Sequence, residues 1–348
     1  MFELWFGIVA VMLTAYVVLD GYDLGAGALH LLVARTGEER RQVLAAVGPF
    51  WDANEVWLLA AGGALFVAFP RVLAAGLSGF YLAIFLVLWM LILRAVSIEF
   101  RSHLADGLWR RMWDTGFTVA SAALAILFGA AIGNVIRGLP LTADGWFELT
   151  LFTDFSARPP VGILDWYTVL TGGCALVALA GHGATYLAWR TEGPVHRRAM
   201  RLARVVFVAL AVLWPLVTFA TNVVNPDLLP ALPGRPLAWL GVLAAAAGLV
   251  AALVALARGQ PLVAFLGSSA WIVGMLVATA ACLFPVLLKA VPDSAHSITA
   301  YNGGNTVDGL RTALGWWVVG FPIAVAYFVV LFRLHRGKAV AARDGEGY

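Results

Sequence analysis

The stretch Leu19-Asp-Gly-Tyr-Asp-Leu-Gly-Ala-Gly27 places two aspartates, Asp20 and Asp23, near the middle of the first apolar segment of the chain. A carboxylate in the hydrocarbon of a bilayer is costly unless it is paired, protonated or hydrated. Residues three apart share one face of a helix. We interpret the pair as part of an ion or proton path. The alternative is that the aspartates cap a kink or bond to a neighbouring helix.

Composition identifies an all-α polytopic membrane protein. Hydrophobic residues make up 61% of the chain and charged residues 12%, against about 25% charged in soluble domains, and the mean hydropathy is +0.87. About nine segments are long enough to cross roughly 30 Å of hydrocarbon as helices. They lie at 4–33, 53–70, 74–99, 115–136, 163–189, 202–224, 237–257, 262–288 and 313–334.

The distribution of Lys and Arg predicts the orientation, because cytoplasmic loops are enriched in both. With the N-terminus outside and the C-terminus cytoplasmic, the inner loops and tail hold 16 of the 23 basic residues and the outer loops six. The remaining one, Arg94, lies within a span. The inner loops also explain the net charge of +3 without nucleic acid. Glu3 precedes the first span instead of a cationic region, so we expect a retained helix and not a cleaved signal peptide.

A second acidic cluster, Asp52 and Glu55, begins the second span on the cytoplasmic side. Acids are ordinary at a helix N-terminus, where the dipole favours negative charge. Here, however, Trp51, Asn54 and Trp57 flank them. Aromatic walls with an amide donor are typical of a pocket that binds a ring.

Arg94 needs a partner inside the membrane, unless it extends to the interface. The carboxylates named above and Glu99 are the candidates, and Arg94 could instead hold a polar oxygen of a ligand. His182 is the one histidine of six that lies clearly inside a span. A single embedded histidine does not make a bis-histidine haem site, so a hydrogen-bonded interior histidine is favoured over a haem ligand. The other five are expected to be solvated: His30, His103, His196, His296 and His335.

Other chemistry has little support. Cys174 and Cys282 both lie in spans, where a disulfide or a Cys-rich metal site is not expected, and we interpret them as packing residues. The sequence contains no phosphate-binding loop, Cys/His metal spacing or nucleophile elbow.

Five ordered motifs within the first 101 residues resemble subunit II of cytochrome bd quinol oxidase. They are Asp20-Gly-Tyr-Asp-Leu-Gly-Ala-Gly27, Trp51-Asp-Ala-Asn-Glu-Val-Trp-Leu58, Gly62-Gly-Ala-Leu-Phe66 with Phe69-Pro70, Ser78-Gly-Phe-Tyr81, and Arg94 with Glu99-Phe-Arg101. Gly183-Ala-Thr-Tyr-Leu187 and Phe284-Pro285 extend the resemblance over nearly the whole chain, less specifically.

The resemblance implies a single transmembrane domain over 1–336, with bundles of four helices at about 4–136 and 163–288, a peripheral helix at about 313–334 and a cytoplasmic tail at 337–348. It implies a haem-free subunit of the bacterial plasma membrane that pairs with a subunit I holding haems b and d, and in some members with a small single-helix subunit. The complex would oxidise ubiquinol or menaquinol and reduce oxygen to water, without pumping protons.

For individual residues, the resemblance implies a proton path from the cytoplasm that includes Asp20 and Asp52, and to this path we add Asp23, Glu55 and Glu99. It also implies a candidate site for ubiquinone or menaquinone at Trp51, Trp57 and Arg94. Two rival classes stay open at this point: a proton-coupled membrane transporter, which intramembrane acids beside an arginine also suit, and a purely structural subunit.

Overall fold

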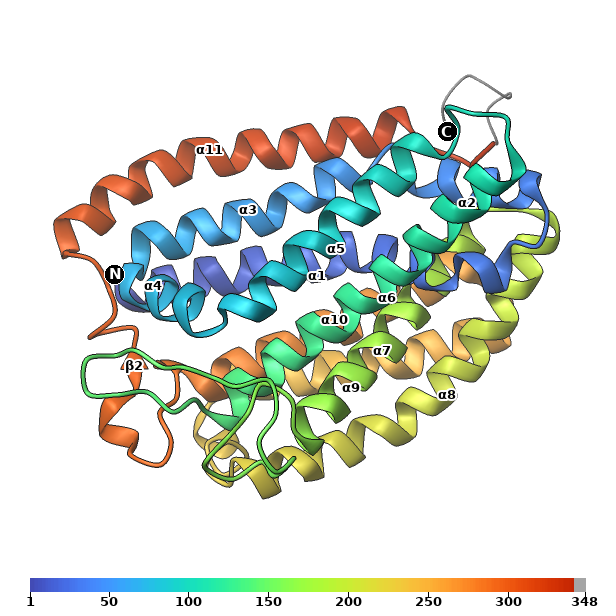
Figure 1. Ribbon diagram of the computed structural model, residues 1–348. Helices are drawn as coiled ribbons and strands as arrows, with labels where there is room; N and C mark the ends of the chain where they lie inside the picture. Colours follow the sequence, from blue (N-terminus) through green and yellow to red (C-terminus); the bar gives the residue numbers. More distant parts are fainter. Residues whose placement is uncertain (341–348) are drawn as a thin grey trace.

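The structure, a computed structural model, describes residues 1–340 and is built almost entirely from helices (Figure 1). Eight helices of this described chain are long and apolar enough to cross a membrane, and nine if the bent pair α3 and α4 is counted as one span. The α-helices are α1 (Phe2–Val33), α2 (Gly37–Val47), α3 (Trp51–Ala68), α4 (Pro70–Gly79), α5 (Tyr81–Phe100), α6 (Gly107–Arg137), α7 (Trp166–Arg190), α8 (Gly193–Val224), α9 (Pro236–Ala257), α10 (Pro261–Leu283) and α11 (Val307–Leu334).

The long helices form two groups and one outlying helix. In the first group α1 packs against α3 and α6, and α5 packs against α6. In the second, α7 to α10 form a closed ring through the pairs α7–α8, α8–α9, α9–α10 and α7–α10. The groups meet where α1 and α6 lie along α7. Figure 1 shows α11 at the edge of the molecule, where it packs on α3.

Loops gather at the two ends of the helices. One end, here the α2 end, holds α2, the start of α3 and the start of α6 (Figure 1). The opposite end, here the hairpin end, holds α4, the long connection 138–165 and the 3-10 turns η1 (Leu232–Gly234) and η2 (Ser294–His296). It also holds the antiparallel strands β1 (Val286–Leu288) and β2 (Ile298–Thr299). Asp165 caps α7 and binds Arg137 at the end of α6, which ties both ends of the long connection to the bundle.

Several predicted boundaries are wrong for identifiable reasons. The segment expected at 74–99 is divided into α4 and α5, because Pro70 starts a new helix that ends at Gly79, and α4 is bent 120° from α3. The residue before a proline disfavours helical geometry, and Phe69 has φ −134° and ψ 61°. The span expected at 262–288 ends at Leu283, and its last three residues, Val286–Leu288, form the strand β1 instead.

Polar helical turns extend other spans beyond their apolar cores. α6, α8 and α11 begin at Gly107, Gly193 and Val307, before the predicted 115, 202 and 313. Asp106 and Thr306 cap two of these starts by accepting hydrogen bonds from backbone N–H groups. Hydropathy reports the membrane-embedded part of a helix and not its full length. Of the expected tail 337–348, residues 341–348 lie outside the described residues.

The two groups of helices approach closely at a pair of glycines. A methyl group on Gly25 of α1 would lie 1.8 Å from the carbonyl oxygen of Leu179 on α7. One on Gly183 of α7 would lie 2.3 Å from the backbone nitrogen of Ala26. Because both contacts are with backbone atoms, only glycine permits this approach. It fixes α1, which carries Asp20 and Asp23, against the second group.

Candidate functional site

The centre of the first group holds a fully buried ion pair between Asp20 of α1 and Arg94 of α5. The two guanidinium Nη atoms of Arg94 donate to the two carboxylate oxygens of Asp20 at 2.9 and 2.7 Å. Both side chains are 0% exposed. Bidentate pairing is the strongest arrangement of these groups, and it offsets much of the cost of removing two charges from water. Asp20 therefore holds Arg94 in place.

Glu55 of α3 is the third member of this central cluster, which we define as Asp20, Glu55 and Arg94. Arg94 Nη2 donates to Glu55 Oε2 at 3.3 Å, and the Glu55 side chain is 21% exposed. Within residues 1–340 its carboxylate is paired with Arg94, and it has some access to the surface. Arg94 thus bridges three helices, and its guanidinium carbon lies 6.0 Å from the ring centre of Trp51.

Asp23 lies beside the central cluster and is held by Asn54 of α3. Asn54 Nδ2 donates to Asp23 Oδ2 at 2.7 Å, and Tyr22 Oη and the carbonyl oxygen of Leu19 lie 2.8 and 3.1 Å from the same nitrogen. Asp23 is 1% exposed and Asn54 0%. The other carboxylate oxygen of Asp23 has no hydrogen-bond partner among the described residues.

The remaining predicted carboxylates lie at the surface of the chain. Asp52 is exposed in the first turn of α3, one turn before Glu55. Glu99, one of the candidate partners of Arg94, is exposed near the end of α5. The carboxylates that bind Arg94 are those of Asp20 and Glu55. Asp52 and Glu55 share a face of α3, so carboxylates lead from the surface to Arg94.

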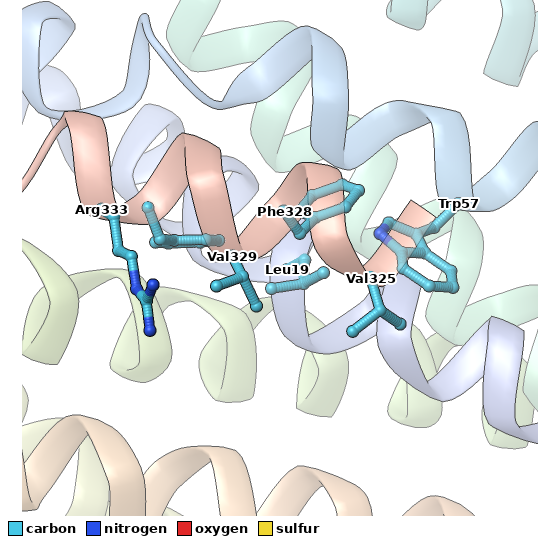
Figure 2. Close-up of a pocket in the computed structure, with 7 residues that line it drawn as sticks. Leu19, Trp57, Val325, Phe328, Val329 and Arg333 are labelled. Carbon is cyan, nitrogen blue, oxygen red and sulfur yellow. The ribbon is translucent and has the colours of Figure 1, made fainter. Parts of the chain in front are cut away.

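The candidate quinone residues face different surroundings. Trp51 adjoins Arg94, whereas Trp57 lines a cavity of about 410 Å³ between α1, α3 and α11. Figure 2 shows Trp57 and Arg333 at opposite ends of this cavity. The Nε1 atom of Trp57 is buried and has no hydrogen-bond acceptor among residues 1–340. The lining consists of Leu19, Trp57, Val325, Phe328, Val329, Phe332 and Arg333.

His182 of α7 uses both ring nitrogens for hydrogen bonds within the chain. Nδ1 lies 2.7 Å from Ser268 Oγ, and Nε2 lies 2.9 Å from the carbonyl oxygen of Val18. The ring stacks on Phe265 at a centroid distance of 4.9 Å. Neither nitrogen is available to haem iron in this arrangement. Residues 1–340 contain no group of three or more His, Cys, Asp or Glu side chains that could hold a metal ion.

A second buried cluster, which sequence reasoning missed, lies nearer the α2 end. Asp114 of α6 accepts hydrogen bonds from Arg101 Nε at 2.5 Å and Arg40 Nη1 at 3.0 Å, and its Oδ1 lies 2.8 Å from His30 Nε2. We call these four residues the rim cluster. His30 is 0% exposed, so the expectation that it is solvated is wrong. The available signal was its position seven residues after Asp23, on the same face of α1.

The fold and these clusters define a class of protein: a polytopic helical membrane protein with paired charges buried inside its bundle. A sequence profile of the cytochrome bd terminal oxidase subunit II family matches residues 1–335. The chain belongs to this family.

Individual relatives agree with this assignment. The chain is 38% identical to cytochrome bd-I ubiquinol oxidase subunit 2 of Escherichia coli strain K12 over 217 aligned residues. These residues make up 62% of this chain and 55% of that protein. The chain is 30% identical to a probable cytochrome oxidase subunit 2 of Haemophilus influenzae, over 94% of this chain and 92% of the relative. In fold, it is similar to a chain in the structure of bd oxidase from Geobacillus thermodenitrificans, with a TM-score of 0.72 and 15% identity. That match covers 96% of this chain and 98% of the other.

Proposed function

We propose that this chain is the haem-free subunit of a bd-type quinol oxidase in the bacterial plasma membrane. It binds and stabilises a haem-bearing subunit I and provides a path for the protons that oxygen reduction consumes. Family membership supports the assignment to the complex, because relatives carry the name ubiquinol oxidase. Whether the quinol is ubiquinol or menaquinol, and whether a small single-helix subunit joins, depends on the partner chains.

One observation carries the proton path: exposure decreases stepwise along the acidic residues of α3 toward Arg94. Asp52 is exposed, Glu55 is 21% exposed, and the pair of Arg94 and Asp20 is fully buried. Surface and half-buried carboxylates can take up and release protons, whereas Arg94 stays charged. We assign proton uptake to Asp52 and Glu55. Asp20 supports the path by holding Arg94, and Asp23 and Glu99 lie at its margins.

The haems belong to subunit I in this proposal, because the described residues of this chain do not fit a haem. Of the two fully buried histidines, His182 bonds to Ser268 and Val18 with its two ring nitrogens, and His30 bonds to Asp114 through Nε2. Haem supplies electron transfer and oxygen binding in such complexes. What this chain contributes is protein support and protonatable groups.

Substitution of the two α3 carboxylates tests the path. In the purified complex, Asp52→Asn and Glu55→Gln should lower the rate of oxygen reduction by about tenfold, which corresponds to about 1.4 kcal/mol, with the haem spectrum and subunit ratio unchanged. Asp144→Asn, in the exposed connection 138–165, is the matched control. Full activity in both α3 variants would refute the path and favour a purely structural subunit.

Purification tests the complex itself. An affinity tag on this chain should recover a second, haem-bearing subunit. A protein that is stable alone and colourless would instead support a proton-coupled transporter.

A further inference from the structure

The rim cluster and the central cluster occupy the same helices at two levels. On α1, Asp23 and His30 are two turns apart, and Arg94 of α5 and Arg101, the residue that follows this helix, are also two turns apart. Two turns correspond to about 10 Å. The proposed path through Asp52 and Glu55 uses α3 and does not involve this interval.

Ser97 lies between them on α5. It follows Arg94 by three residues and precedes Arg101 by four, so the three share one face of the helix. Ser97 is 1% exposed, and its Oγ has no hydrogen-bond partner among the described residues. A methyl group on Gly116 of α6 would lie 2.6 Å from this Oγ. The hydroxyl therefore faces α6.

Ser121 occupies the corresponding place on α6. It is 0% exposed, and its Oγ also lacks a partner within residues 1–340. A methyl group on Gly27 of α1 would lie 2.1 Å from this oxygen. Gly27 lies between Asp23 and His30, so the Ser121 hydroxyl lies against α1 between the two levels.

The ends of this interval carry further unused hydrogen-bonding atoms. His30 Nδ1 and Asp23 Oδ1 are buried and have no partner in the described chain. Together with Ser97 Oγ, Ser121 Oγ and Arg94 Nε, they make five such atoms at or between the two levels in the described chain. Buried polar groups are normally hydrogen-bonded to protein or water, and packing alone would favour alanine at these serines. A row of such atoms along one interval of the bundle is therefore where bound water would be needed to satisfy them.

We propose that Ser97 and Ser121 connect the rim cluster to the central cluster as a second proton inlet, with His30 as its entry group. The proposal rests on the proposed function. A hydroxyl accepts a proton on oxygen and releases its own to the next acceptor or to water, so one proton advances and the group is restored. Imidazole does the same between its two nitrogens. The groups facing His30 are Asp114 and Phe117 of α6, while Arg101 and Arg40 contact Asp114 from α5 and α2.

The test is the double variant Ser97→Ala/Ser121→Ala in the purified two-subunit complex. Removing an unpaired buried hydroxyl leaves no orphaned partner, so folding should be unaffected. We expect an unchanged haem spectrum and subunit ratio. When they are added to Asp52→Asn/Glu55→Gln, whose remaining rate the second inlet carries, the two serine substitutions should lower oxygen reduction by about a further tenfold, most strongly at high pH, where protons are scarce. The solvent isotope effect on the rate should rise, because proton transfer then limits turnover.

His30→Gln is the second variant. It keeps a hydrogen-bond donor for Asp114 but cannot pass a proton between two ring nitrogens, and it should show the same pH profile and isotope effect. Thr115→Ala is the matched control, since it removes an exposed α6 hydroxyl that bonds to its own helix at Arg111.

An unchanged rate and isotope effect when the serine substitutions are added to Asp52→Asn/Glu55→Gln would overturn the second inlet, as would an equal loss when Thr115→Ala is added instead. If Asp52→Asn and Glu55→Gln abolish activity while the double variant retains it, α3 is the sole inlet. The proposed function then stands without this inference. Loss of the haem-bearing partner from the wild-type preparation would refute the function itself.

Discussion

Among the acidic residues of the site, Asp20 is best suited to a structural role, because both oxygens of its carboxylate accept hydrogen bonds. Each binds a different Nη atom of Arg94, and neither side chain is exposed. Glu55 shares the same guanidinium at 3.3 Å and reaches the surface. The two carboxylates on one arginine therefore differ in burial and in the number of hydrogen bonds that they accept from it.

Breaking the buried pair from one side should destabilise the complex strongly. Asp20→Asn leaves the charge of Arg94 with Glu55 alone, and such losses are about 3 to 5 kcal/mol. The apolar double variant Asp20→Leu/Arg94→Met should recover most of this stability, because no isolated charge remains. Thermal unfolding of the complex in detergent measures both. If Asp20→Asn is as stable as wild type, the carboxylate does not hold Arg94.

Glu39 of α2 gives a pH dependence at the surface of the α2 end. Hydrogen bonds from Arg198, at 2.9 and 2.8 Å, are the main cause that lowers the pKa of Glu39 from 4.5 to about 2. Because the pKa of Glu39 is depressed in the folded state, the stability that its pairing with Arg198 contributes is complete above pH 4.5. It is lost as pH falls toward 2. The protection of the α2 amides, which is the factor by which they exchange more slowly than in an unfolded chain at the same pH, should therefore fall over that interval. Glu39→Gln should exchange faster already at neutral pH and lose most of the pH dependence.

The charged residues of the site can be identified in the sequence, because charges are rare in membrane-spanning segments. Which of them pair with one another cannot be read from the sequence. Arg94 had several candidate partners, since the rotation of each helix and the reach of each side chain decide which carboxylate it meets. Ser97 and Ser121 give no sequence signal at all, because serine is common in membrane helices and packs as a small residue. The burial of His30 could have been predicted from its spacing of seven residues from Asp23, but its position near the end of a span led to the expectation that it is solvated.

At the scale of elements, the glycines of α1 decide how the two groups of helices join. Gly25 and Gly183 allow α1 and α7 to meet backbone to backbone. Hydropathy located the spans because each has a long apolar core, but it could not locate the break at Phe69 and Pro70 or the polar first turns of α6 and α8. Those depend on caps and on single backbone conformations.

Gly25→Ala should separate α1 from α7. The added methyl group would lie 1.8 Å from the carbonyl oxygen of Leu179, and since a backbone atom cannot move aside, we expect a loss of about 3 kcal/mol. Gly7→Ala on the same helix has no atom within 4 Å of the new methyl group and should gain up to about 1 kcal/mol from helix propensity. Thermal unfolding of the two variants gives the comparison. Equal stabilities would contradict close packing at Gly25.

At the scale of the whole molecule, charge and fold point to one orientation. Basic residues of the inner set lie on α2, at the end of α5 and at the starts of α6 and α8, which are at the α2 end. The α2 end should therefore face the cytoplasm. The rim cluster lies toward this end, so an inlet there would draw protons from the side that the proposed function requires.

Cysteine labelling in intact cells tests this orientation. With Cys174 and Cys282 replaced by alanine, Asp144→Cys in the connection at the hairpin end should react with a membrane-impermeant maleimide from outside. Glu38→Cys on α2 should react only after permeabilisation. Both positions are exposed, so accessibility within the fold does not distinguish them. The reverse pattern would place the α2 end outside. Both proposed inlets would then open to the wrong side of the membrane, because the start of α3 and the rim cluster lie toward the same end.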